Sequence, residues 1–315
     1  MNLTSKPYIG EYDLEKTIDL LLKTRIHTSV ERHPTVWRLR QLLNLRLREP
    51  GRDARLWEDA AGNLLGFAFL YRQSREDSLL GLGWIIHPHM QATPLPVTML
   101  DWAQARVREM AQEQQKMVSL NLAVYEDEEE KRTLLESSGF VLMQDIHNWY
   151  MARALDGPLS EPVLPEGFTI RPLTGEAEDD VEMYEHIYGF PPVKRPYRLA
   201  LLRDPDYLHQ VAVAPDSAFV AYCELSVNRR EWALSGRRVG WIDYVGTHQD
   251  FRRRGLSKAI VHVGLHQLRL WGADTALLTT LNSNTPAQKT FLTSGFHVSE
   301  RDFCYTKAIT HTLPS

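Results

Sequence analysis

The chain carries one ordered pattern of motifs twice, and this repeat is the strongest constraint on its fold. Ser137-Ser-Gly-Phe140 in the first half recurs as Thr293-Ser-Gly-Phe296 in the second. Upstream of each motif lie, in the same order, a loop, a helical pattern, an apolar strand-like run and a second helical pattern. Self-similarity at a fixed spacing is the sequence signature of a repeated structural unit. We therefore expect two copies of one fold in tandem.

Each copy is predicted to combine strands and helices in one layered structure. Apolar runs predict strands upstream of each loop, at 54–58, 64–70 and 79–86 and again at 210–214, 218–227 and 238–247. Downstream, the two sets of helix, strand and helix are 97–115, 118–124 and 128–137, and 256–271, 275–281 and 286–294. A last strand with aromatic residues follows, near Trp149 and near Tyr305. This order is typical of a mixed α/β fold.

The length fits the same division. At 315 residues the chain is too long for one ordinary domain, whereas two domains of about 150 residues fall in the usual range. Three prolines and two glycines between Leu155 and Gly167 indicate a linker. We expect one domain over residues 1–155, a linker over 156–166 and a second domain over 167–315.

The composition argues against several classes of protein. The net charge is −4 and the pI is about 6.3, values that are not typical of proteins binding nucleic acid or membrane surfaces. No segment approaches the roughly 20 apolar residues of a membrane span, and the first residues lack the apolar core of a signal peptide. Cys223 and Cys304 lie in strand-like runs, and we expect two buried, reduced thiols. We expect a cytoplasmic protein, and the oligomeric state stays open.

The two loops differ in their capacity to bind an anion. The second-half loop, Arg252-Arg-Arg-Gly-Leu-Ser257, opens a helix, so its backbone N–H groups and the helix dipole favour a negative charge. Gly255 lets the backbone approach a ligand closely. The first-half loop has Pro94 and Pro96 instead, and proline has no N–H to donate. We therefore expect one working phosphate site, in the second copy.

Another motif follows the second-half loop. It consists of N-x-x-A at Asn284-Thr-Pro-Ala287, followed by G-F at Gly295-Phe296. The preceding loop supplies R-x-x-G-x-S, with Arg252, Gly255 and Ser257. This combination resembles the Gcn5-related N-acetyltransferase (GNAT) superfamily, in which Q/R-x-x-G-x-G/A binds the pyrophosphate of acetyl-CoA. Ser257 replaces the final glycine or alanine of that pattern. The resemblance covers the second half directly and the first half through the internal duplication.

The resemblance implies two tandem GNAT-like domains, each a mostly antiparallel mixed sheet flanked by helices, with acetyl-CoA or another acyl-CoA as co-substrate. The loop would hold the pyrophosphate, the splayed strand before it would bind the pantetheine and acetyl group, and Asn284 would reach the pantetheine amides. The implied cofactor-binding residues are Tyr244, Val245, Thr247, Arg252, Arg253, Arg254, Gly255, Leu256, Ser257, Lys258, Asn284 and Phe291.

Phe291 marks a departure from the family, which has at this position a tyrosine proposed as the general acid. A phenyl ring donates no proton, and we expect Phe291 to pack against the cofactor. Either Ser294 or Tyr305 protonates the departing thiolate, or it leaves unassisted, because a thiol pKa near about 8.5 makes it a fair leaving group.

The general base is sought on the strands beside the expected acyl group. A base must accept a proton from the attacking amine. Asp243 is the first candidate, because strand alternation puts it on the same face as Val245. Glu224 is the second candidate and His209 the third. The structural alternatives are an ion pair between Asp243 and a nearby arginine, and a solvated Glu224.

The first copy departs from the family much further. Besides its two prolines, it has Glu128, Lys131 and Leu135 where the family has asparagine, alanine and tyrosine. The acidic run 126–130 would also repel a polyanionic cofactor. We expect residues 1–155 to form a GNAT-like domain that does not bind acetyl-CoA and instead packs on the second domain and walls the substrate cleft.

Two histidine pairs, an acidic run and an aromatic cluster are further candidate sites. His87 with His89 and His262 with His266 lack the partners of a metal site, so we expect no metal, and we expect the second pair on a solvated helix face. The acidic run 176–180 is read as a helix N-terminus, with recruitment of a cationic amine as the alternative. Aromatic residues that could line an acceptor pocket are Tyr184, Tyr188, Phe190, Tyr197 and Tyr207.

The sequence thus favours an N-acetyltransferase that moves an acetyl group from acetyl-CoA to a primary amine of a small molecule, such as an amino sugar, by direct attack in a ternary complex. Two alternatives stay open. One is a non-catalytic protein that binds or senses acyl-CoA, and the other is an acetyltransferase acting on a protein or peptide.

Overall fold

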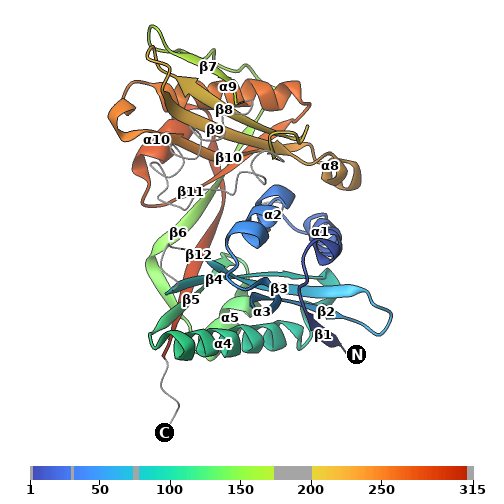
Figure 1. Ribbon diagram of the computed structural model, residues 1–315. Coiled ribbons are helices and arrows are strands. Elements are labelled where there is room, and N and C mark those ends of the chain that lie inside the picture. Colours follow the sequence, from blue (N-terminus) through green and yellow to red (C-terminus); the bar gives the residue numbers. More distant parts are fainter. Residues whose placement is uncertain (1–2, 30–31, 74–77, 174–200, 311–315) are drawn as a thin grey trace. The chain divides into compact units, whose positions relative to one another are not determined.

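The computed structural model describes residues 3–29, 32–73, 78–173 and 201–310, and these form two compact units (Figure 1). Unit 1 comprises Met1–His147 together with Asp302–Ser315. Unit 2 comprises Asn148–Arg301. The strands of each unit follow one another in the order of the sheet, and each unit has its own apolar core.

The sheet of unit 1 is antiparallel except at one junction. Its strands, in spatial order, are β1 (Thr4–Pro7), β2 (Ala54–Glu58), β3 (Leu64–Arg72), β4 (Leu79–Ile86), β5 (Val118–Tyr125) and the end of β12 (His297–Ile309). Only β4 and β5 pair in parallel among these neighbours. The helices are α1 (Glu11–Arg25), α2 (Val36–Leu45), α3 (Pro50–Asp53), α4 (Leu95–Gln114) and α5 (Glu129–Ser137), with a 3-10 turn, η2 (Pro88–Met90).

Alternation along β3 builds two apolar layers in unit 1. Ala68 and Leu70 face the core that α4 covers, whereas Phe67 and Phe69 face the core made with α1 and α2. Apolar residues recur along α4 at helical spacing, and the helix lies along one face of the sheet with α1 and α2 on the other (Figure 1). The sheet of unit 1 is therefore buried on both faces.

Unit 2 repeats this plan. Its strands, in spatial order, are the end of β6 (Val141–Ala154), β11 (Thr275–Leu281), β10 (Val239–Thr247), β9 (Phe219–Val227), β8 (Tyr207–Val213) and β7 (Thr169–Pro172). Its helices are α8 (Arg229–Ser235), α9 (Leu256–Leu270) and α10 (Thr285–Thr293), with a 3-10 turn, η3 (Gln249–Phe251). On β9, Cys223 and Leu225 face the core under α9, while Tyr222 belongs to a cluster on the other face.

The last strand of each half is exchanged between the units. β6 of the first half pairs with β11, from Asn148 opposite Leu281 to Ala154 opposite Thr275. β12 of the second half pairs with β5 of unit 1, from Asp302 opposite Tyr125 onward. The two observed units therefore differ from the domains 1–155 and 167–315 expected from the sequence. The strands of each unit include one from the other half of the sequence.

Each exchanged strand places a cation on the glycine of a Gly-Phe turn. In unit 1, Lys307 donates a hydrogen bond to the carbonyl of Ser138 at 2.6 Å, beside Gly139. In unit 2, a Cβ added to Gly295 would lie 3.0 Å from Nη1 of Arg153. Both glycines have positive φ, +81° and +84°, which a side chain would strain. In both units the glycine of the Gly-Phe motif therefore lies against a cationic side chain of the exchanged strand.

The predicted strands and helices that surround the two loops are confirmed within a few residues. Sequence reasoning missed α8, although its caps are visible: Asn228 accepts a hydrogen bond from the N–H of Glu231, and Gly236 ends the helix in the left-handed conformation. The two cysteines are free thiols as predicted, with Cys223 buried and Cys304 half-buried. Among the described helices, none has the length and apolar character of a membrane span.

The exchange predicts that a change near the C-terminus loosens unit 1. Tyr305 is buried in the core of unit 1, so Tyr305→Ala should destabilise that unit by about 2–5 kcal/mol and speed hydrogen exchange in β5 and α5. The matched variant is Met151→Ala. The Met151 side chain is buried in the core of unit 2, so its removal should speed hydrogen exchange in β9–β11. If each substitution instead speeds hydrogen exchange in its own half of the sequence, the strand exchange is contradicted.

Candidate functional site

The loop before α9 has the backbone shape of an anion site. Gly255 is the N-cap of α9 with φ +85°, and Arg253 also has a positive φ, +61°. A Cβ at Gly255 would meet nothing within 4 Å, so the backbone angle requires the glycine here. N–H groups in the first turn of a helix have no carbonyl partner inside it, and with these left-handed residues they form a concavity suited to phosphate.

Side chains of the loop brace this shape. Arg252 donates through Nε to the carbonyl of Thr247 at 3.2 Å, and Arg254 donates through Nη2 to the carbonyl of Asp250 at 3.2 Å. The guanidinium of Arg254 also lies over the ring of Phe251, 5.0 Å from its centroid. Of the predicted binding residues, Arg252, Arg253, Arg254 and Lys258 are exposed, Ser257 is half-buried and Leu256 is buried in the core.

Strands β10 and β11 part just before this loop. They pair in parallel from Val239 opposite Thr275 to Trp241 opposite Leu277, and the pairing then stops although β10 continues to Thr247. β9 stays paired with β10 along this stretch. The ladder between β10 and β11 thus ends at Trp241, well before β10 itself ends at Thr247.

A β-bulge at Asp243 corrects the predicted facing of this strand. Ile242 lies opposite Leu225 and Tyr244 opposite Glu224, so Asp243 is the extra residue on β10. Val245 packs in the core under α9, while Tyr244 packs with Tyr222 on the opposite face. The prediction that Asp243 and Val245 share a face is therefore wrong, because the bulge shifts the alternation by one residue.

Asp243 lies among polar residues on the face opposite α9. Ser226 donates a hydrogen bond through Oγ to Oδ2 of Asp243 at 2.5 Å. Glu224 is fully buried (0% exposed), which contradicts a solvated Glu224, and it lies opposite the equally buried His209 of β8. The structure thus gathers all three candidate bases on three adjacent strands. Ser226 was missed, because strand alternation alone gave no signal for it.

The second motif forms the start and end of α10. Asn284 is the N-cap and accepts a hydrogen bond from the N–H of Ala287 through Oδ1. Phe291 is buried in the core of unit 2 and lies edge-on to Phe296, with 6.1 Å between ring centroids. Ser294 is buried at the C-cap of the same helix.

Tyr305 is withdrawn as a candidate acid. It lies on the part of β12 that pairs with β5 in unit 1, and it is buried in the core of that unit. Its hydroxyl donates to Oε1 of Glu136 at 3.0 Å, and burial with this carboxylate raises the pKa of Tyr305. The strand exchange explains the error, because it carries Tyr305 out of the unit that holds the Arg252–Lys258 loop.

The corresponding loop of unit 1 lacks these donors. Pro94 is the N-cap of α4 and Pro96 lies in its first turn, so two N–H groups are absent. The N–H of Leu95 donates instead to Oγ1 of Thr93 at 3.3 Å, and that hydroxyl donates to the carbonyl of Met90. The contrast predicted between the two loops is present in the structure as a difference in available backbone donors.

Side-chain contacts link β4 to α5 in unit 1. The parallel pairing of β4 with β5 also stops after three residue pairs, at Gly81 opposite Asn121. Further along β4, Nζ of Lys131 on α5 lies 5.5 Å from the ring centroid of Trp84. Glu128 accepts from Lys131 at 3.0 Å and from the N–H of Tyr125 at 2.9 Å. These contacts join the end of β5 and the start of α5 to β4.

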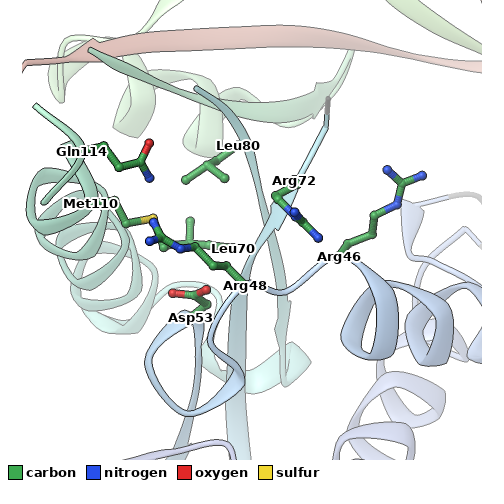
Figure 2. A pocket seen from close by; sticks show the side chains of 8 residues that line it. All are labelled: Arg46, Arg48, Asp53, Leu70, Arg72, Leu80, Met110 and Gln114. Carbon is green, nitrogen blue, oxygen red and sulfur yellow. The ribbon is translucent and has the colours of Figure 1, made fainter. Parts of the chain in front are cut away.

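A small pocket in unit 1 lies at the other end of α4 (Figure 2). Figure 2 shows Met110 and Gln114 projecting from α4 toward Leu70 and Leu80. A helix of 20 residues spans about 30 Å, so this pocket is far from Pro94 at the helix start. Its cavity of about 10 Å³ has room for one water molecule. The other residues that line it are Arg46, Arg48, Asp53 and Arg72.

The histidine predictions have separate outcomes. His87 accepts a hydrogen bond from the N–H of His89 within a tight turn, and the described residues contain no group of three or more metal-ligand side chains. His262 is buried, so its predicted solvated face is wrong. The linker explains this: His262 bonds to the backbone of Glu161, His266 lies 3.2 Å from the carbonyl of Ser160, and Arg269 donates to Gly157.

Two predictions fall on residues outside the described ranges. These are the acidic run 176–180 and the aromatic residues Tyr184, Tyr188, Phe190 and Tyr197. The remaining aromatic, Tyr207 on β8, is buried and lies opposite Ser226 on β9.

The two units repeat one α/β fold, and the second unit carries the left-handed Gly255 loop before α9. Residues 175–296 match the acetyltransferase (GNAT) family. A tandem GNAT protein from the clavulanic acid biosynthesis pathway has the same fold over 100% of both chains, with TM-score 0.67 and 14% identity. A GNAT protein from Sphaerobacter thermophilus covers 99% of this chain and 97% of its own, with TM-score 0.67 and 20% identity.

Several sequence relatives are mycothiol acetyltransferases. A mycothiol acetyltransferase of Streptomyces bingchenggensis is 25% identical over 84% of this chain and 84% of its own length. A mycothiol acetyltransferase of Segniliparus rotundus is 27% identical over 48% of this chain, which covers 59% of that relative. The chain thus spans less than two thirds of some relatives that it matches.

The linker contact predicts a pH dependence of stability. Burial is the main cause that lowers the pKa of His262 from its ordinary 6.5, and Lys258 and Arg153 lower it further. The unfolded chain therefore binds a proton more readily, so stability is full above pH 6.5 and falls as the pH drops through that value. His262→Gln should flatten this fall in urea denaturation measured between pH 7 and pH 5. His266→Gln is the matched control, and an unchanged slope in His262→Gln would contradict the prediction.

Proposed function

We propose that this protein is an N-acetyltransferase that moves the acetyl group of acetyl-CoA to a primary amine of a small molecule. The observation that carries the proposal is the left-handed Gly255 loop that follows β10, together with the end of the β10–β11 ladder at Trp241 opposite Leu277. The loop suits a pyrophosphate, and the parting of two parallel strands gives room for an extended amide chain beside β10. The match of residues 175–296 to the GNAT family supports the same assignment.

The cofactor would bind along these two features. The N–H groups from Arg253 to Lys258 would hold the pyrophosphate, with the exposed arginines adding positive charge. The stretch of β10 from Tyr244 to Thr247 would lie along the pantetheine arm. Asn284 would contribute at the start of α10, although its Oδ1 already caps that helix. Phe291 packs on Phe296, which supports an apolar supporting role for this residue.

The reaction would be a direct attack in a ternary complex. The amine nitrogen attacks the thioester carbonyl, the carbon–sulfur bond breaks, and coenzyme A departs as a thiolate. A backbone N–H near Val245 would stabilise the developing oxyanion. Asp243 would accept the proton of the amine, with Glu224 as the second candidate. Burial of Phe291 and of Ser294 favours a thiolate that leaves without a protein acid.

The acceptor is proposed to be a small molecule. The relatives named mycothiol acetyltransferase support this class of acceptor over a protein or peptide. A panel of amino sugars, aminoglycosides and short peptides, assayed for release of coenzyme A thiol, tests it. Turnover restricted to peptides would overturn the small-molecule assignment, and tight acetyl-CoA binding without turnover on any amine would favour the acyl-CoA sensor.

Unit 1 is proposed to bind no acyl-CoA. Its loop lacks two donors at Pro94 and Pro96, and Lys131 contacts both Trp84 and Glu128 beside the corresponding strands. A crystal structure with acetyl-CoA bound in unit 1 would overturn this.

The loop assignment predicts the effect of one glycine. Gly255→Pro forbids φ +85° and removes an N–H, so the affinity for acetyl-CoA should fall by about 100-fold or more, given about 1.5–3 kcal/mol for each hydrogen bond to a charged group. Isothermal titration calorimetry measures it. Gly236→Pro is the matched control, because Gly236 also has positive φ and donates its N–H, but ends α8. Equal affinities in Gly255→Pro and the wild type would refute the site.

The base assignment predicts a separation of kinetic constants. Asp243→Asn keeps the size of the side chain but cannot take a proton at neutral pH, so kcat should fall by about 10²–10⁴-fold while the KM for acetyl-CoA stays within about twofold. Steady-state assays with the best amine of the panel measure both constants. Asp216→Asn, at an exposed turn, is the control. A wild-type kcat in Asp243→Asn would remove Asp243 and leave Glu224 as the candidate.

A further inference from the structure

The bulge on β10 gives Asp243 a partner that regular pairing would not. In a regular antiparallel ladder one residue lies opposite each residue of the neighbour. Here Trp241 lies opposite Ser226 and Ile242 opposite Leu225, and Asp243 is inserted before Tyr244 opposite Glu224. The carboxylate of the inserted Asp243 accepts a hydrogen bond from the Ser226 hydroxyl on β9, with 2.5 Å between Oγ and Oδ2.

Ser226 is well placed to fix that carboxylate. It is 3% exposed, and β9 is paired on both sides, with Tyr207 of β8 opposite Ser226 on one side and Trp241 of β10 on the other. Its backbone position is therefore set by the sheet and not by a loop. A hydroxyl that donates to an ionised carboxylate makes a short, strong hydrogen bond and restricts the rotation of the acid.

Neighbouring titratable groups influence the ionisation of Asp243, so this hydrogen bond matters for its charge. The titratable groups on the same face are Tyr207 and His209 of β8, Tyr222 and Glu224 of β9 and Tyr244 of β10. A second carboxylate nearby opposes ionisation of the first, and burial does the same. A donor aimed at Asp243 acts in the opposite direction and keeps it in the form that accepts a proton.

We propose that Ser226 is a positioning residue for acetyl transfer, which holds the carboxylate of Asp243 ionised and oriented toward the attacking amine. The proposal rests on the proposed function, in which Asp243 is the base. Ser226 touches neither substrate nor cofactor in this role. It acts through the Oδ2 atom of Asp243 and leaves the chemistry of the thioester unchanged.

A carboxyl titration tests the contact without any acceptor. In the full-length protein labelled with ¹³C at aspartate carboxyls, the Asp243 signal is assigned by its loss in Asp243→Asn. Ser226→Ala should raise the pKa of this carboxyl by about one pH unit, a tenfold change in the protonation equilibrium, because the charged form loses its donor. Ser226→Thr keeps a hydroxyl and should restore the wild-type value. Ser235→Ala, which removes a hydroxyl bonded to the carbonyl of Glu231 in α8, should change nothing.

The pH profile of kcat/KM then links the contact to turnover. With the best amine acceptor, the acidic limb of the profile should move to higher pH in Ser226→Ala by the same amount as the NMR pKa, and the affinity for acetyl-CoA should stay unchanged. An unmoved NMR pKa overturns the proposal while acetyl transfer stands. A shifted pKa with an unmoved acidic limb also overturns it, because Asp243 is then not the base. A wild-type protein that turns over no amine defeats the proposed function itself, and the proposal with it.

Discussion

The parting of β10 from β11 is the constraint on which the rest of unit 2 depends. Two parallel strands that stay paired satisfy each other's backbone groups and leave nothing for a ligand. Here the pairing with β11 stops after Trp241 opposite Leu277, while the pairing of β10 with β9 continues to Thr247 opposite Ala221. The bulge at Asp243 lies within this stretch, and the loop at Gly255 follows it. The bulged carboxylate and the glycine loop thus both come after the point where the two parallel strands part.

The two units share one plan of strand pairing and differ at a few positions. Both have a parallel junction of three residue pairs followed by a parting. In unit 1, prolines at 94 and 96 remove backbone donors, and Lys131 and Trp84 contact each other beyond the junction. The apolar cores under α4 and α9 are alike in plan. Packing therefore keeps the architecture while polar and backbone positions around the two loops differ.

Local chemistry decided how much could be predicted from the sequence. Gly255 and Pro94 were informative because their backbone limits hold in any fold, and the repeated strands and helices followed from short-range patterns. The bulge at Asp243 could not be predicted, because strand alternation assumes that no residue is inserted. The burial of His262 could not be predicted, because the linker buries it and the linker sequence has no pattern that would place it on α9. The pairing of β6 with β11 could not be predicted, because neither strand's sequence indicates a partner so far away in the chain.

The exchanged strands also impose an order on synthesis. During translation β5 of unit 1 is complete long before the ribosome reaches Asp302–Ile309, the segment that pairs with it. Until then that edge of the sheet carries unpaired N–H and C=O groups, which invite association with other chains. The pocket for Tyr305 beside Glu136 also stays unfilled for this period. The sheet of unit 1 can therefore be completed only after Asp302–Ile309 has been synthesised, and the edge of β5 needs protection until then.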